Sequence, residues 1–285
     1  MNLTERAPVD FAPAAVIVTG TPEGGYLLNS PMPLGPYEEN LGVMFRRCAA
    51  EFPERTFLGE RDSSGQWSLL TYAEAACQAD AIAQAFIDRN LSADRPVMIF
   101  SGNSIGHALV TLGGFIAGVP VVPVSAAYSL LSQDFVKLKT IFSEVKPALL
   151  YVEKADMFSH ALDVLDLSDV EVVISHGQAN RPVTTLASLT KTVPTLQVDQ
   201  RFAQVGPASI AKILFSSGST GIPKGVLNSH DMLCANQQMM AQVWPFTRET
   251  PPVLVDWLPW NHTFGGNHNF NMVLKRGGTL YIDGG

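Results

Sequence analysis

Short apolar runs alternate with longer amphipathic stretches through most of the chain. From residue 71 to about 89 the apolar positions recur at helical spacing, and Thr71 with Glu74 forms a capping box at the start. Apolar runs at 96–100 and 119–124 flank a second helical stretch. This alternation predicts parallel strands joined by helices, in a sheet that is covered on both faces.

The same alternation continues to residue 282. We predict helices over 133–145, around 157–165, over 229–243 and over 264–275, and strands over 148–152, 170–174, 211–215, 253–258 and 279–282. Residues 1–40, rich in Pro, Gly and Thr, are expected to form an irregular arm. We therefore expect an α/β fold of mostly parallel sheets with helices on both faces. We expect a first subdomain over residues 41–206, and the start of a second subdomain over residues 207–285.

Composition narrows the classes of protein. The 285 residues are 46% hydrophobic and 16% charged, which suits a packed core and argues against disorder. The net charge of -7 and the scattered Lys and Arg residues argue against a nucleic-acid partner. Cys48, Cys77 and Cys234 are an odd, widely spaced set, which fits neither a disulfide framework nor a zinc site. With no signal-peptide pattern at the N-terminus, we expect a cytoplasmic protein.

One long stretch, 96–133, contains no Asp, Glu, Lys or Arg. A membrane span needs about 20 apolar residues. Here polar residues, prolines and glycines divide the stretch into strand, helix and strand. We therefore expect a buried βαβ unit and no membrane span.

The segment Phe215–Val226 carries the strongest chemical signal, because it reads F-S-S-G-S-T-G-I-P-K-G-V. Its glycines let backbone N–H groups approach an anion, and its hydroxyls and Lys224 add donors and charge. A Gly/Ser-rich segment is more often a plain turn or linker. This one follows a buried strand, is expected to precede a helix, and contains a lysine and a stiffening Pro223. It is not a Walker A loop, because Gly225 follows Lys224, and no G-x-G-x-x-G pattern is present.

The segment Ser216–Gly225 closely resembles the signature loop of the adenylate-forming superfamily, which includes acyl- and aryl-CoA synthetases, luciferases and peptide-synthetase adenylation domains. The resemblance implies the N-terminal part of the adenylate-forming fold. It also implies an ATP phosphate site made by Ser216, Ser217, Gly218, Ser219, Thr220, Gly221 and Lys224. Thr220 is then the implied Mg²⁺ ligand, and Lys224 steadies the pyrophosphate leaving group.

A second motif agrees with the first. Leu258–Gly266 matches the superfamily element Leu-Pro-x-x-His-x-x-Gly, which implies that His262 lies beside the substrate carboxylate and is catalytic together with Lys224. Phe264 and His268 are four residues apart and share a helix face. By resemblance they join His262 in the acid pocket. A metal site at these histidines is less favoured, because no Cys, Asp or Glu stands at ligand spacing.

Within the superfamily the chain most resembles feruloyl-CoA synthetases. The resemblance rests on four segments: Ser101–Ser104, Met232–Gln238, Trp257–His262 and Tyr281–Gly285. It implies a ligase that uses ATP, Mg²⁺ and coenzyme A on an aromatic acid such as ferulate, through an acyl-adenylate. A luciferase-like or peptide-synthetase role shares the same loop.

The chain ends at Gly285, and the superfamily's later motifs are not found in it. These are the adenine- and Mg²⁺-binding element, the ribose-binding aspartate and the lysine of the mobile C-terminal domain. We therefore expect an N-terminal fragment that is nearly inactive alone. The alternative is a non-catalytic nucleotide-binding or interaction module derived from half of such an enzyme. Open strand edges would favour self-association into a homo-oligomer.

Overall fold

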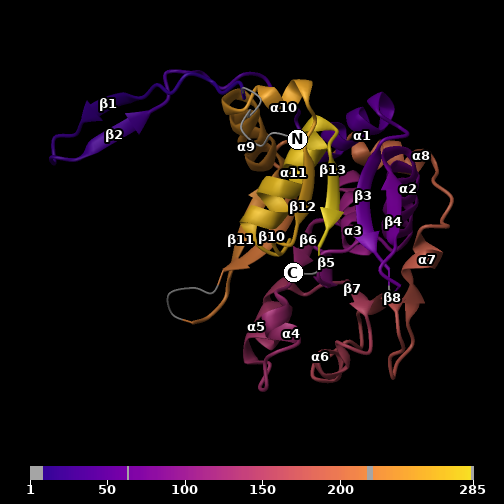
Figure 1. Cartoon of the computed structure of the whole chain (residues 1–285). Coiled ribbons are helices and arrows are strands. Elements are labelled where there is room, and N and C mark those ends of the chain that lie inside the picture. Colours follow the sequence, from indigo (N-terminus) through magenta and orange to yellow (C-terminus); the bar gives the residue numbers. More distant parts are fainter. Residues whose placement is uncertain (1–8, 63, 217–220, 284–285) are drawn as a thin grey trace.

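The computed structural model describes residues 9–62, 64–216 and 221–283. Its larger sheet has seven strands in the order β11-β10-β6-β5-β7-β8-β9 (Figure 1). The strands are β5 (Val97–Phe100), β6 (Val121–Pro123), β7 (Leu149–Lys154), β8 (Glu171–His176), β9 (Thr184–Thr185), β10 (Ile210–Ser216) and β11 (Lys224–Ser229). All neighbours in this sheet pair parallel except β10 and β11, which pair antiparallel.

A four-stranded sheet has the order β12-β13-β3-β4. Its strands are β3 (Thr56–Arg61), β4 (Trp67–Thr71), β12 (Val253–Asp256) and β13 (Thr279–Ile282). Strands β12, β13 and β3 pair parallel, and β4 is antiparallel to β3. Both sheets thus take strands from either side of residue 206.

The helices pack between and outside these sheets. They are α1 (Leu41–Glu51), α2 (Tyr72–Asp88), α3 (Ile105–Ala117), α4 (Ala126–Ser129), α5 (Val136–Val145), α6 (Ser159–Asp163), α7 (Leu186–Leu189), α8 (Leu196–Phe202), α9 (His230–Val243), α10 (Phe246–Glu249) and α11 (Phe270–Arg276). A π-helix, η1 (Thr263–Asn269), runs directly into α11.

Successive side chains of a buried strand point to opposite faces of the sheet, and so into different hydrophobic clusters. Val97 and Ile99 of β5 join the cluster that contains α1, α2, α3 and the four-stranded sheet. Met98 and Phe100 point to the opposite cluster, under α5 and α6. The α2–α3 layer therefore lies between the two sheets, and the seven-stranded sheet has helices on both faces, as the sequence predicted.

Most predicted helices and strands are present. The capping box at Thr71 and Glu74 forms, and Ser104 and Ser229 cap α3 and α9. Within the described residues no helix has the length and apolarity needed to cross a membrane.

Some local features differ from the prediction or were missed by it. The arm at 1–40 is not irregular throughout, because β1 (Ile17–Gly20) and β2 (Tyr26–Asn29) form a hairpin that projects from the body (Figure 1). Strands β3 and β4 were not predicted, since β4 is mostly exposed and lacks a long apolar run. The single helix expected at 264–275 is a π-helix followed by an α-helix.

Candidate functional site

The predicted phosphate loop joins two paired strands. β10 enters the loop at Ser216 and β11 leaves it at Lys224, and these two residues are register partners. The Ser216 hydroxyl also donates to Lys224 O over 3.5 Å. The expectation that a helix directly follows the loop was wrong. Residues Lys224–Ser229 instead pair with the edge of β10, which satisfies backbone groups that would otherwise lack partners.

The end of the loop is open and shaped by one glycine. Gly221 has φ +79°, and among the described residues no atom lies within 4 Å of a Cβ built there. A residue other than glycine at this position would therefore be strained by the backbone conformation and not by a steric clash. Pro223 is buried, and Lys224 is exposed at the start of β11. Ser217, Gly218, Ser219 and Thr220 lie outside the described residues.

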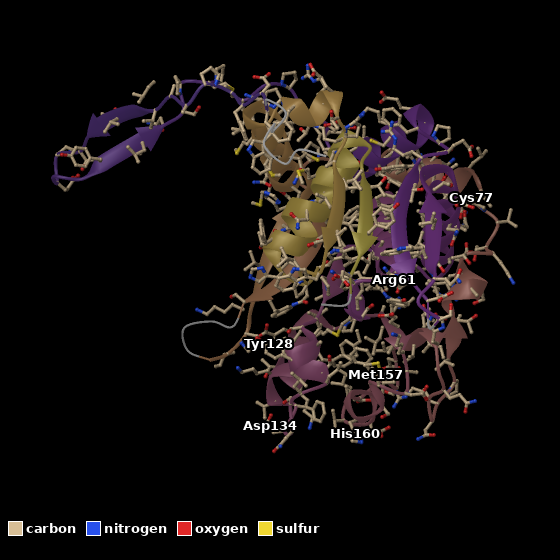
Figure 2. All side chains as sticks on the ribbon, in the orientation of Figure 1. Arg61, Cys77, Tyr128, Asp134, Met157 and His160 are labelled. Atoms are coloured by element: carbon tan, nitrogen blue, oxygen red, sulfur yellow. The ribbon has the colours of Figure 1, made fainter. Side chains whose placement is uncertain are left out.

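A groove lies beside the end of the loop. It has a volume of about 500 Å³, and Gly221, Ile222 and Pro223 line one side of it. Tyr128 and Asp134, from the α4–α5 region, line the other side and are labelled in Figure 2. The described end of the loop therefore forms one side of an open groove.

The second predicted motif forms the start of η1. His262 precedes η1, and its Nδ1 accepts a hydrogen bond from Phe264 N over 3.4 Å. A ring nitrogen that accepts carries no proton, so the neutral ring holds its proton on Nε2. The exposed His262 side chain can therefore donate through Nε2 to a ligand oxygen.

An aromatic cluster stands beside His262. The rings of Phe264 and His268 are 4.8 Å apart between centroids, as their spacing on one face predicted. Trp244, at the end of α9, packs edge-on against His268 at 5.8 Å. Trp244 was missed because no motif marks it, and only the fold brings it to η1.

The loop strand and the His262 element contact each other. Asn267 of η1 donates through Nδ2 to Asn228 Oδ1 of β11 over 3.1 Å. Gln237 of α9 donates to Asn267 O over 2.8 Å. The two motifs, well separated in sequence, thus sit on touching elements.

Several buried polar atoms under η1 have no hydrogen-bond partner in the described part of the chain. They include Gln237 Oε1, Asn267 Oδ1 and both amide atoms of Asn271. Buried polar atoms in native proteins are normally satisfied, often by ordered water. No group of three or more His, Cys, Asp or Glu residues suited to a metal occurs among the described positions.

The fold and these motifs define an α/β protein in which a strand-loop-strand element lies beside a π-helix capped by His262. Residues 45–284 match the family model described as AMP-binding enzyme. The chain belongs to this family.

Two curated proteins are similar to this chain in sequence at low identity. An octahydroindenyl-propanoyl:CoA ligase from Rhodococcus jostii is 24% identical over 82% of this chain and 46% of its own length. The long-chain-fatty-acid–AMP ligase FadD23 of Mycobacterium tuberculosis is 25% identical over 78% of this chain and 37% of its own.

Among solved structures, the fatty acyl-adenylate ligase from L. pneumophila, in complex with acyl adenylate and pyrophosphate, superposes with a TM-score of 0.65. It is 21% identical, with 85% of this chain and 39% of that chain covered. The chain therefore spans less than half the length of these relatives. This similarity shows that the chain has the fold of the N-terminal part of adenylate-forming enzymes.

Proposed function

We propose that this chain supplies the ATP-phosphate site and the carboxylate-facing histidine of an AMP-forming acid–CoA ligase. The observation that carries the proposal is the contact between the two motif elements through Asn228 and Asn267. It brings β11, the strand that follows the loop, against η1, the π-helix whose N-cap is His262. An acid and a triphosphate bound at these elements would be neighbours.

The proposed chemistry has two balanced steps. A carboxylate oxygen of the acid bonds to the α-phosphorus of ATP, and the bond to the bridging oxygen breaks, releasing pyrophosphate. The sulfur of CoA then bonds to the acyl carbon, the acyl-phosphate bond breaks, and AMP leaves as the thiol proton is lost. The first step depends mainly on positioning and on neutralising phosphate charge.

In this scheme the described residues have distinct tasks. Lys224 places a cation where the loop closes, and the conformation of Gly221 lets the backbone turn around the phosphates. His262 donates from Nε2 to the acid carboxylate. The contacting rings of Phe264, His268 and Trp244 would form an aromatic wall for the acid.

Magnesium fits this donor set as an ion that arrives with ATP. Mg²⁺ is commonly held by one or two protein oxygens together with phosphate oxygens and water. The proposed protein ligand is the hydroxyl of Thr220, which lies outside the described residues. Bound there, the ion would neutralise charge on the pyrophosphate leaving group.

We further propose a hydroxycinnamic acid such as ferulate as the substrate. The support comes from the motif segments at 101–104, 232–238 and 257–262, and from the aromatic side chains beside His262. The names of the relatives include fatty-acyl and fused-ring acids, so the acid has to be tested directly.

The test is a panel of acids offered to the full-length gene product with ATP, Mg²⁺ and CoA. AMP formation is measured with ferulate, a medium-chain and a long-chain fatty acid, each with and without CoA. We expect turnover with ferulate that requires CoA. Turnover with fatty acids alone would refute the ferulate assignment, and acyl-adenylate release independent of CoA would place the protein among AMP ligases.

A further inference from the structure

Two side chains hold the ends of segment 258–266, which carries His262. At the first end, Asn103 Nδ2 donates to Leu258 O over 2.9 Å. Its Oδ1 accepts from Trp260 N, also over 2.9 Å. One amide therefore pairs with a carbonyl and an N–H two residues apart, much as a neighbouring strand would.

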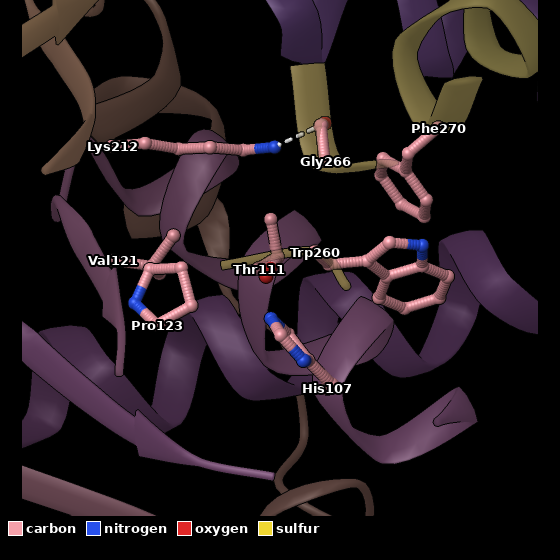
Figure 3. A pocket seen from close by; sticks show the side chains of 8 residues that line it. All are labelled: His107, Thr111, Val121, Pro123, Lys212, Trp260, Gly266 and Phe270. Atoms are coloured by element: carbon pink, nitrogen blue, oxygen red, sulfur yellow. Dashed lines mark hydrogen bonds between the residues drawn. The ribbon is translucent and has the colours of Figure 1, made fainter. Parts of the chain in front are cut away.

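Lys212 holds the other end. Its Nζ donates to Gly266 O over 2.7 Å (Figure 3). Lys212 lies on β10, the strand that leads into the phosphate loop, and it is only 3% exposed. The bond therefore ties the loop strand directly to the backbone of η1.

Two aromatic rings flank the ammonium group of Lys212. Its Nζ lies 5.6 Å and 5.5 Å from the ring centroids of Phe115 and Phe270. A cavity of about 10 Å³, no larger than one water molecule, adjoins it and is lined in part by His107 and Trp260 (Figure 3). Within the described chain Lys212 forms no ion pair.

A buried lysine at this position lowers the stability of the fold. Burying an ammonium group without a carboxylate loses hydration that a single carbonyl does not replace. A methionine would fill nearly the same space without that loss. The bond to Gly266 O is therefore the feature that distinguishes lysine from an apolar residue at this position.

We infer that Asn103 and Lys212 are positioning residues, which fix segment 258–266 from both ends and so set where His262 stands relative to β10. The inference rests on the proposed function for its catalytic meaning. The restraint that the two side chains place on segment 258–266 is a property of the fold and can be measured separately from activity.

The variants Lys212→Met and Asn103→Leu remove the polar contacts while keeping much of the side-chain volume. Tyr72→Phe is the matched control, because the Tyr72 hydroxyl donates to Gly278 O over 2.9 Å, at the far end of α11. Each variant of the full-length gene product is studied by amide hydrogen exchange of residues 260–269, by chemical denaturation and by acid-dependent AMP formation.

We expect both test variants to speed exchange in 260–269 and to lower kcat by about 10- to 100-fold, with a smaller change in KM. Lys212→Met should unfold at the same or a higher denaturant concentration, so the loss of turnover is not a loss of stability. The control should match wild type in exchange and kcat.

Unchanged exchange in the Lys212→Met protein would overturn the inference. Faster exchange without a fall in kcat would show that holding the segment does not serve catalysis. If wild type forms no AMP with any acid, the proposed function fails. The hydrogen-exchange experiment still tests whether Asn103 and Lys212 restrain segment 258–266.

Discussion

Packing alone does not explain why residue 212 is a lysine. Burial lowers its pKa from near 10.5 to about 7, and His107 and His230, also buried, have their pKa values lowered to about 4 by burial and by the nearby lysine charge. The folded chain therefore binds fewer protons at this site than the unfolded chain between pH 7 and 10.5. The contribution of Lys212 to the free energy of unfolding must therefore rise with pH across that window.

This gives a prediction for wild type against Lys212→Met. Between pH 7 and pH 9 the wild-type free energy of unfolding should rise by about 2 kcal/mol more than that of the variant. Urea denaturation at the two pH values measures the difference. Parallel pH profiles for the two proteins would show that Lys212 is not desolvated in the fold.

Gly221 gives a second prediction at the scale of one residue. Its φ of +79° suits Gly and tolerates Asn better than a β-branched residue, and the space around its Cβ position is open. Gly221→Asn should therefore keep more ATP-dependent activity than Gly221→Val. Equal activity in both variants, measured as AMP formation, would mean that the backbone conformation at 221 does not matter.

At the scale of elements, η1 depends on close backbone approach. A Cβ on Gly266 would contact Trp260 O, whereas a Cβ on Gly102 meets nothing within 4 Å. Gly266→Ala should destabilise the protein by about 1–3 kcal/mol and reduce AMP formation. Gly102→Ala is the control and should leave the denaturation midpoint unchanged; a Gly266→Ala protein that behaves the same way would contradict the packing of η1.

Periodicity predicted the elements whose apolar pattern is complete, such as α2 and β5. It missed β4, where only Leu70 is buried, because one buried side chain makes no pattern. It also missed β11, because pairing with β10 overrides a Gly-containing sequence that carries no strand signal. Motifs identified Lys224 and His262, but Trp244 and Lys212 became part of the site only through tertiary contacts.

At the scale of the whole molecule, the hairpin β1–β2 exposes apolar residues on an arm away from the core (Figure 1). Val18 and Leu28 are register partners, 55% and 64% exposed. Exposed apolar edges favour association. We predict concentration-dependent self-association, to be measured by sedimentation velocity.

The double variant Val18→Lys/Leu28→Glu should weaken that association while its opposite charges keep the strands paired. Val193→Lys, at another exposed apolar residue, is the control. If the hairpin variant and the control sediment alike, the arm is not the contact.

The central claim is that the loop at 216–224 holds the phosphates of ATP for acid activation. The most direct test is acid-dependent exchange of labelled pyrophosphate into ATP by the full-length gene product, in wild type, Lys224→Ala and Lys191→Ala. Lys191 is exposed and lies outside the site, so it controls for the loss of a positive charge. We predict that Lys224→Ala lowers the exchange rate by about 100-fold, as expected for removal of one charge-stabilising group, and that Lys191→Ala matches wild type. Equal exchange rates in all three proteins would contradict the account.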